Sequence, residues 1–441
     1  MTAKSPYGSG HDKSSGQGGV TGPPSGDVAA GSTVQVLVIN QHGDNRGDEA
    51  ALRAMLWGLE REHGAPIDFT IIHQFRRYDD DVPLHLDQAV RWLRLRARLS
   101  LLAYAIVLLL GRRPSRLLGR HVQRFDEAYR SADLVISAPG GPYFGDLYVN
   151  HEIVHWFYVW LAKQHRRPVM LYAPSAGPFR RRLMNPIRRW LFRSMDVLSV
   201  REVRSAEHLR SLLGDDAEVT VTADSALQRP IAAPESGRDP TDSPPVVAVS
   251  ALAWRYPGAT NADARRHAYD EALRAGMHHL HEVLGCRFIL LPQLYGAHHS
   301  DVPYLEELGD GLPSTVPWEV FDPAEDSDAQ QRVVAGAEFC IASRYHPQVF
   351  AVSAATPGVC IYYEHKALGL MESVGLERFA LDIDTLVAGT LVEAIDEALA
   401  HSGEIVDTMT DAAPRLARRA AQTSKIAVGL LHQHASPQVE V

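Results

Sequence analysis

The chain has 441 residues, a net charge of -9 and 45% hydrophobic residues, which suits two or three soluble globular domains of about 150 residues each. The acidic balance argues against a nucleic-acid-binding protein, whose basic residues should dominate. Its three cysteines, Cys286, Cys340 and Cys360, match no metal-binding spacing, and an odd number suits no disulfide framework. We therefore expect no metal site, and reduced, buried thiols in a cytoplasmic protein.

Two segments of low apolar content divide the chain. Residues 1–31 are rich in Gly, Ser and Pro and lack the apolar core of a secretory signal, so we expect a disordered tail. Residues 229–245 are rich in proline and read as a linker. On either side, apolar strands alternate with helices. This pattern predicts an α/β fold with two doubly wound, Rossmann-like domains, residues 32–228 and 246–441, facing a cleft.

The first predicted strand, residues 34–40, leads into a loop and then a helix over residues 50–63. The loop contains Gly43, Asn45, Gly47, Asp48 and Glu49. Its glycines allow backbone to approach a ligand, and Asp48 or a neighbour can cap the helix. The loop matches neither the Walker A motif nor G-x-G-x-x-G, and a tight turn before a well-capped helix explains it equally well.

Further strands are predicted at residues 132–137, 168–172 and 196–200. The first of these leads into a second glycine loop, which contains Gly140, Gly141 and Asp146. The last delivers Arg201 to the start of a helix, where it could bind an anion. Arg201 could instead form a salt bridge between the domains.

Arginine is concentrated in two parts of the first half. Residues 91–120 hold an uncharged run, 99–110, between arginine clusters. That run is too short to span a bilayer, which needs about 20 residues. It could lie in a membrane interface, or form a buried helix with solvated basic ends. The second part is a predicted basic helix over residues 180–193.

The second half places three basic side chains at strand ends. Arg344 and His346 follow an apolar strand, residues 339–342, and precede a helix over 348–355. A second strand, 359–363, leads to Lys366. The carboxyl ends of parallel strands are where ligands bind in such sheets, and a helix N-terminus favours anions. The pattern predicts a site for a small anion, although Arg344 and His346 could merely cap the helix and pair with surface carboxylates.

An ordered set of short motifs resembles the polysaccharide pyruvyl transferase family from about Val34 to Leu376. The matching pieces are Gly43-x-Asn45-x-Gly47-Asp48-Glu49, Gly140-Gly141 with Asp146, Gly177-Pro178, Val200-Arg201-Glu202, Ala223-Asp224, Pro292-Gln293, Arg344-x-His346 and Tyr363-x-x-Lys366. Pro142, Ser225 and Pro347 depart from the family's usual pattern, as does the basic insertion at residues 91–120.

The resemblance implies a fold similar to the GT-B glycosyltransferases and the transfer of a pyruvyl group from phosphoenolpyruvate to two hydroxyls of a saccharide, forming a ketal. No cofactor is implied. His346 would be the general acid/base, with Arg344 and Lys366 holding the donor and Arg201 as a further anion ligand. Asp48, Glu49 and Asp146 would contact sugar hydroxyls or act as base, unless they only cap helices.

The implied partners are phosphoenolpyruvate and a saccharide or lipid-linked saccharide, without nucleic acid. The donor would bind mainly in the second domain and the acceptor in the first. The expected location is the cytoplasm, with peripheral contact at a membrane. Two alternatives remain: a GT-B-like glycosyltransferase using a nucleotide sugar, and a non-catalytic sugar- or lipid-binding relative.

Overall fold

The computed structural model describes residues 33–73, 86–88, 90–94, 98–111, 119–141, 144–146, 149–231, 244–257, 259–296 and 299–435. The predicted tail and most of the predicted linker lie outside these residues. From Val34 onward, the described residues belong to one compact unit built on two parallel sheets.

The first sheet has seven parallel strands in the order β3-β2-β1-β4-β5-β6-β7. The strands are β1 (Gln35–Gln41), β2 (Asp68–His73), β3 (Val90–Arg94), β4 (Leu134–Ser137), β5 (Val169–Leu171), β6 (Val197–Val200) and β7 (Thr220–Val221). Most are continuous apolar runs, because a parallel sheet is covered on both faces.

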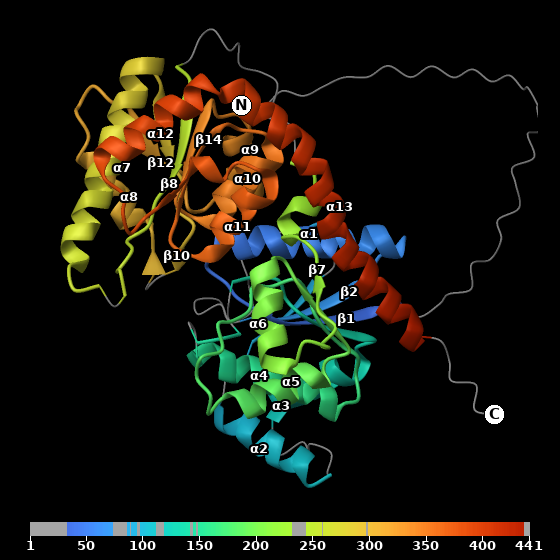
Figure 1. Ribbon diagram of the computed structural model, residues 1–441. Helices are drawn as coiled ribbons and strands as arrows, with labels where there is room; N and C mark the ends of the chain where they lie inside the picture. Colours follow the sequence, from blue (N-terminus) through green and yellow to red (C-terminus); the bar gives the residue numbers. More distant parts are fainter. Residues whose placement is uncertain are drawn as a thin grey trace, which may run out of the picture. The chain divides into compact units, whose positions relative to one another are not determined.

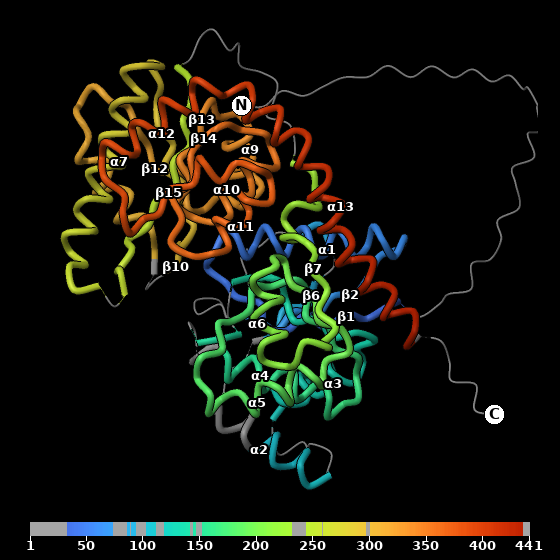
Figure 2. The backbone as a smooth tube through the Cα atoms, viewed as in Figure 1, coloured from blue at the N-terminus to red at the C-terminus, as the bar shows by residue number. Residues whose placement is uncertain are grey.

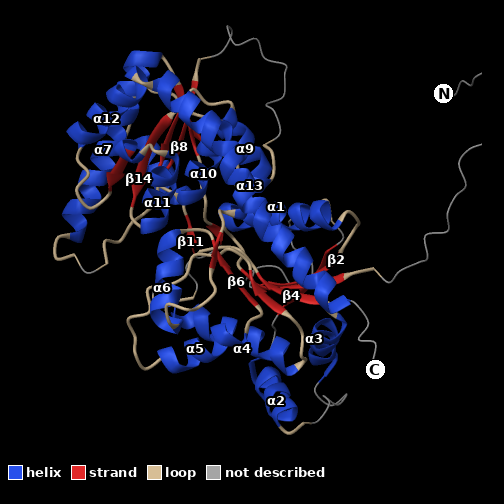
Figure 3. Cartoon of the chain, turned by 45° about the vertical axis from the view of Figure 1, so that its right-hand side comes forward, coloured by secondary structure: helices blue, strands red, loops and turns tan. Residues whose placement is uncertain are grey.

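Helices cover both faces of this sheet (Figure 3). Leu37 and Ile39 of β1 face one layer, which contains α2 (Arg98–Leu109), α3 (Gly119–Ser131), α4 (Val149–Gln164), α5 (Asn185–Ser194) and α6 (Val203–Leu213). Val36 and Val38 face the other layer, which contains α1 (Arg46–His63) and the end of α13 (Ser402–Ala435). Alternation of side chains along the strand therefore sends neighbouring residues into different cores.

The second sheet has six parallel strands in the order β12-β9-β8-β13-β14-β15. They are β8 (Val246–Ser250), β9 (Arg287–Leu290), β12 (Trp318–Val320), β13 (Phe339–Ala342), β14 (Gly358–Tyr362) and β15 (Ala380–Asp382). The helices of this half are α7 (Ala262–Leu284), α8 (Val302–Asp310), α9 (Ser327–Ala335), α10 (Tyr345–Ala354), α11 (His365–Val374) and α12 (Ala388–Ala400). The predicted α/β class, with two doubly wound, Rossmann-like halves, is confirmed.

The 34-residue helix α13 connects the two halves (Figures 1 and 2). Its earlier part contributes Met409, Leu416 and Ala420 to the core of the second sheet. Its later part contributes Ala427 and Leu431 to the core under the first sheet, beside α1. The C-terminal segment thus packs with both sheets, and the predicted domain boundaries stay a prediction.

Local structure differs from expectation at several points. Helix α1 begins at Arg46, because the Asn45 side chain accepts hydrogen bonds from the backbone N–H groups of Gly47 and Asp48. Asn45 is therefore the N-cap, and Asp48 lies in the first helical turn. Residues 90–94 form the edge strand β3 rather than leading into a helix.

The uncharged run in the first half forms α2. Its Tyr104 is buried and donates to Asp126, whereas Ile106 and Leu109 are exposed. In the described part of the chain, no helix is both long and apolar enough to cross a bilayer. All three cysteines are buried and free, as expected.

Candidate functional site

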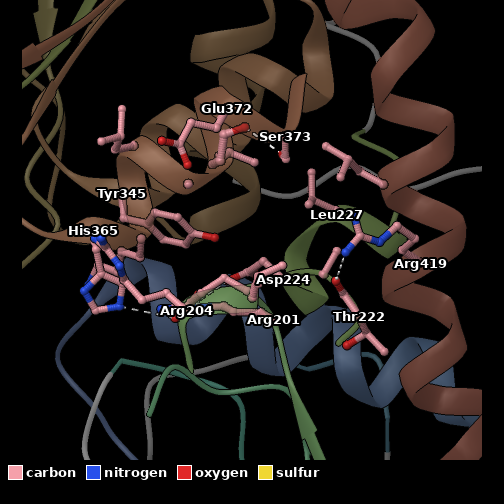
Figure 4. Close-up of a pocket in the computed structure, with 18 of the residues that line it drawn as sticks. Arg201, Arg204, Thr222, Asp224, Leu227, Tyr345, His365, Glu372, Ser373 and Arg419 are labelled. Atoms are coloured by element: carbon pink, nitrogen blue, oxygen red, sulfur yellow. Dashed lines mark hydrogen bonds and ion pairs between the residues drawn. The ribbon is translucent and has the colours of Figure 1, made fainter. Parts of the chain in front are cut away.

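A pocket of about 460 Å³ lies where the carboxyl ends of β6 and β7 meet α10, α11 and α13. Basic, acidic and hydroxyl side chains line it together with apolar ones (Figure 4). The charged and hydroxyl members are Arg201, Glu202, Arg204, Glu207, Thr222, Asp224, Tyr345, His365, Lys366, Glu372, Ser373 and Arg419. Segments that follow strands of both sheets contribute lining residues, as expected of a site at the carboxyl ends of strands in α/β domains.

Arg201, which directly follows β6, lies at one end of the pocket. Its Nε donates to Ser175 Oγ at 2.8 Å, and its Nη1 pairs with Asp224 Oδ2 at 2.5 Å. The guanidinium lies over the Tyr345 ring, 4.5 Å from its centroid. Although burial disfavours its charge, the neighbouring tyrosine and carboxylates raise the pKa of Arg201. Its Nη2 is buried without a hydrogen-bond partner.

Asp224 connects Arg201 to the second half. It follows β7, and its Oδ1 accepts a hydrogen bond from the backbone N–H of Ala226 at the start of η2 (Ser225–Gln228). Its Oδ2 lies 3.8 Å from Nε2 of His346. Burial alone raises the pKa of Asp224, but Arg201 and His346 outweigh it, so the net shift is downward. Asp224 is therefore held as a carboxylate between two nitrogen-bearing side chains.

His346 occupies the first turn of α10 and is buried. Burial, and to a smaller extent the positive charges of Arg201 and Lys366, lower the pKa of His346 to about 3, despite the opposing effect of Asp224. Its Nε2 has no hydrogen-bond partner. The imidazole lies against the first turn of α1: a Cβ at Gly47 would come within 1.8 Å of Nδ1. The absence of a side chain at Gly47 thus makes room for His346.

Lys366 enters the pocket from the first turn of α11. Its ammonium group pairs with Glu364 at 2.7 Å and lies 5.6 Å from the centroid of the Tyr345 ring. Burial disfavours its charge, yet Glu364 leads the groups that raise the pKa of Lys366. The side chain is therefore a half-buried cation whose charge acts on His346.

Glu202 continues the charged network from the residue after Arg201. It accepts hydrogen bonds from the hydroxyls of Ser175 and Ser205, and its Oε1 lies 3.7 Å from Nε2 of His365. Burial opposes ionisation, but His365, Arg201 and the serines together lower the pKa of Glu202 to about 2. Glu202 is consequently ionised at neutral pH.

The Arg344 side chain pairs with a different carboxylate from the one next to His346. It is the extended N-cap residue of α10, and its guanidinium pairs with Asp301. Asp301 in turn accepts backbone hydrogen bonds from Gln293 and Leu294. Arg344 does not line the pocket, and its predicted contact with the donor stays a prediction.

The first loop contributes mainly to contacts between the halves. Glu49 pairs with Arg46 and Arg53, and it accepts the backbone N–H of Ser327 in the second half. The backbone N–H of Arg46 donates to the carbonyl of Gln293. Gly43, Asn45, Asp48 and Glu49 are absent from the pocket lining, so their predicted roles in substrate binding stay untested.

The second glycine loop is tied to α5. One carboxylate oxygen of Asp146 accepts the backbone N–H groups of Arg180 and Arg181, and the other pairs with Arg188 at 2.9 Å. Gly140 accepts the backbone N–H of Ser175 through its carbonyl. Asp146, Gly140 and Gly141 are also absent from the pocket lining. Asp146 therefore organises this loop through hydrogen bonds.

Of the predicted site residues, Arg201 and Lys366 line the pocket. His346 is absent from the lining and lies behind it, next to Asp224 and packed against Gly47. Sequence reasoning missed Asp224, Glu202 and Arg419 as members of the site. Asp224 follows a strand as Arg201 does, so its position at a carboxyl end was a usable signal. Arg419, which donates to the carbonyl of Thr222, comes from the long C-terminal helix, and no local pattern marks it. No group of side chains suited to a metal ion occurs in the part of the chain that the structure describes.

Two sequence comparisons bear on this site. Residues 45–365 match the family model "Polysaccharide pyruvyl transferase". The chain is also similar to the amylovoran biosynthesis protein AmsJ of Erwinia amylovora, with 25% identity over 295 residues, covering 65% of this chain and 70% of AmsJ.

Solved structures share the fold at low identity. A UDP-N-acetylglucosamine 2-epimerase superposes with a TM-score of 0.56 and 13% identity, covering 92% of this chain and 98% of the epimerase. The α,α-trehalose 6-phosphate synthase of Burkholderia multivorans gives 0.53 and 12%, covering 92% and 99%. The complex of S. aureus MnaA with UDP gives 0.54 and 12%, covering 86% and 91%.

Proposed function

Because the chain belongs to the polysaccharide pyruvyl transferase family, we propose that it transfers a pyruvyl group from phosphoenolpyruvate to two hydroxyls of a saccharide, free or lipid-linked. The product is a cyclic ketal, and inorganic phosphate is released. The donor needs no further cofactor. A saccharide acceptor follows from the family.

The observation that carries the proposal is a pair of buried, unpartnered nitrogens. Arg201 Nη2 and His346 Nε2 have no hydrogen-bond partner. Both side chains lie next to Asp224, and the charge of Lys366 also acts on His346. Buried polar groups are normally satisfied, so such atoms point to a ligand. Phosphoenolpyruvate carries a carboxylate and a phosphate, and cationic side chains bind both groups well.

The chemistry requires a proton at carbon. Protonation of the methylene carbon of phosphoenolpyruvate leaves a cation-like centre at the adjacent carbon, which one acceptor hydroxyl attacks with loss of its proton. The second hydroxyl then forms the other C–O bond, and the bond from that carbon to the phosphate oxygen breaks. A histidine can deliver and collect these protons, and we assign that role to His346.

The low pKa of His346 is compatible with this role. Without ligand, burial and two nearby cations keep the imidazole neutral. A multiply charged anion beside it adds negative charge, which favours the protonated form. Donor binding should therefore raise the pKa of His346 towards the range in which a general acid works.

Two carboxylates of the pocket lining could bind the saccharide acceptor. Glu207, Glu372 and the hydroxyl of Ser373 line the pocket, and carboxylates accept hydrogen bonds from sugar hydroxyls. We assign binding of the acceptor to these side chains.

A cytoplasmic site of action agrees with the proposed donor and with three free cysteines.

The test is incubation with isotope-labelled phosphoenolpyruvate and a panel of saccharides, with products read by mass spectrometry and phosphate release measured in parallel. His346→Ala should lower turnover by about 100-fold or more while donor binding persists, because general acid–base catalysis typically contributes that much. The matched control is His278→Ala, a partly exposed histidine on α7.

Other outcomes would favour the alternatives. Release of a nucleotide from nucleotide sugars, without use of phosphoenolpyruvate, would assign the pocket to a glycosyltransferase. Binding of phosphoenolpyruvate without turnover on any acceptor would favour a non-catalytic relative. A near-normal rate for His346→Ala would remove this histidine from the reaction.

A further inference from the structure

Helix α5 has two apolar faces, and the fold uses only one. Leu191 and Phe192 point into the core beneath the first sheet, and the fully buried Arg188 pairs with Glu152 at 2.7 Å. Arg189 donates to the carbonyl of Leu212 at the end of α6. These contacts fix the rotation of α5 about its axis.

A neighbouring side of the helix, with the turn before it, exposes large apolar side chains. Leu183, in the turn entering α5, is 95% exposed, and Trp190 is 51% exposed. Ile187 is also exposed and lies three residues before Trp190, a spacing that places both on one face of a helix. Scattered exposed apolar residues are ordinary, but a contiguous group calls for a partner.

Three arginines border this group. Arg180, Arg181 and Arg182 directly precede Leu183 and are exposed. Within the described residues their side chains form no ion pair, although the backbone N–H groups of two of them donate to Asp146. We call Arg180–Leu183 with Ile187 and Trp190 the α5 face. It combines unpaired positive charge with aromatic and aliphatic surface, on a protein whose net charge is -9.

The same helical layer exposes further apolar residues. α2 and α5 both pack on the side of the sheet occupied by Leu37 and Ile39. Ile106, Leu109 and Leu110 are exposed on and just after α2, and Ile153 is exposed on α4. Unpaired arginines next to apolar and tryptophan side chains are the composition of helices that lie in a membrane interface.

We propose that the α5 face binds the surface of an anionic lipid bilayer. The arginines meet the headgroups, and Leu183, Ile187 and Trp190 enter the boundary between headgroups and acyl chains. This attachment is peripheral and reversible. It does not depend on the chemistry in the pocket, and it would keep a lipid-linked acceptor near the enzyme.

The experiment is sedimentation of the full chain with vesicles of equal parts phosphatidylglycerol and phosphatidylcholine, at low and high salt. Vesicles of phosphatidylcholine alone serve as the uncharged comparison. The wild type should sediment with the anionic vesicles at low salt and be released at high salt, because salt screens the charges. Each basic residue near such a surface contributes about 1 kcal/mol, so the triple change Arg180→Gln, Arg181→Gln, Arg182→Gln should weaken binding on the order of 100-fold.

The change Leu183→Ser, Ile187→Ser, Trp190→Ser should weaken binding by about tenfold or more, because less apolar surface enters the lipid. Val283→Ser with Val387→Ser, which removes exposed apolar residues from the second half, is the matched control and should bind normally. Circular dichroism would verify that each variant is folded.

Failure of the wild type to sediment with anionic vesicles at low salt would overturn the proposal, as would normal binding by both α5 variants. A dimer in solution that the apolar triple change converts to a monomer, without lipid binding, would assign this surface to a second copy of the chain. None of these results depends on pyruvyl transfer, so each leaves the proposed function to its own test.

Discussion

The imidazole of His346 occupies a space that exists because residue 47 has no side chain. A Cβ on Gly47 would approach the ring to within 1.8 Å, far inside any real contact. The two residues belong to different halves of the protein, so this contact couples the first turn of α1 to the proposed catalytic histidine. The sequence suggested Gly47 as a position where backbone approaches a ligand; in the structure its lack of a side chain leaves room for His346.

We expect Gly47→Ala to displace His346 and to lower pyruvyl transfer by about tenfold or more, because a misplaced catalytic group forfeits much of its contribution. Steady-state kinetics with phosphoenolpyruvate would measure it. Gly429→Ala is the matched control, since a Cβ there meets nothing within 4 Å. Equal rates for both variants would show that the imidazole position has no influence on turnover.

The low pKa of His346 also predicts a pH dependence of stability. Burial lowers this pKa from 6.5 to about 3, so the folded state binds fewer protons here than the unfolded state. The stability from this group is present above pH 6.5 and is lost progressively as the pH falls towards 3. Between pH 7 and pH 5 the free energy of unfolding should fall by about 2 kcal/mol from this residue.

Urea unfolding at pH 7 and pH 5 would test this expectation. His346→Asn cannot titrate and should lose less stability on acidification than the wild type. His278→Asn, on the surface of α7, should behave as the wild type does. An identical pH dependence in wild type and His346→Asn, under conditions without phosphoenolpyruvate, would contradict the assigned shift.

At the scale of elements, α13 joins the halves through buried hydroxyl groups as well as apolar contacts. Ser424 Oγ lies 2.6 Å from the Tyr172 hydroxyl and donates to Gln228 Oε1 at 2.9 Å. Thr423 donates to the Thr222 hydroxyl at 2.8 Å. Because Thr222 and Asp224 line the pocket, this part of α13 helps to hold the segment that carries them.

Ser424→Ala should therefore destabilise the protein by about 1–3 kcal/mol, the usual cost of leaving buried polar partners unsatisfied. Chemical denaturation would measure the change. Thr410→Val, at an exposed position on the same helix, is the control and should change stability little. A loss in both variants of similar size would indicate a general effect on α13 rather than these hydrogen bonds.

At the scale of the molecule, the proposed donor site draws on both halves. Arg201 and Asp224 follow strands of the first sheet, whereas His346 on α10 and Lys366 on α11 belong to the second half. Phosphoenolpyruvate, as a shared anion, should draw the halves together, a common form of closure in two-domain proteins. Ion pairs already cross between the halves, such as Arg53 with Asp326 at 3.2 Å.

Small-angle X-ray scattering with and without saturating phosphoenolpyruvate would detect this closure as a decrease in the radius of gyration. Arg201→Ala, which removes a ligand from one half, should abolish the decrease. An unchanged radius in the wild type, with donor binding verified independently, would mean that the halves are already closed or that one half binds the donor alone.

Sequence periodicity was sufficient for most elements. The strands predicted at residues 339–342 and 359–363 match β13 and β14 to within one residue, because short apolar runs encode them locally. β3 was missed because the order of its arginines and tryptophan does not match the apolar pattern of a buried strand. It forms because its backbone pairs in parallel with β2 at the edge of the sheet. The start of α1 was misplaced because Asn45 competes with Asp48 as a cap, and backbone geometry decides between them.

The candidate site shows the same division. The sequence alone determined that Arg201, His346 and Lys366 follow strands, and parallel sheets gather such positions at one edge. Only the tertiary structure decided that Arg344 pairs with Asp301, that Asp224 stands between Arg201 and His346, and that Arg419 enters from α13. These pairings join residues far apart in the chain, and burial selects among charged partners that local sequence leaves equivalent.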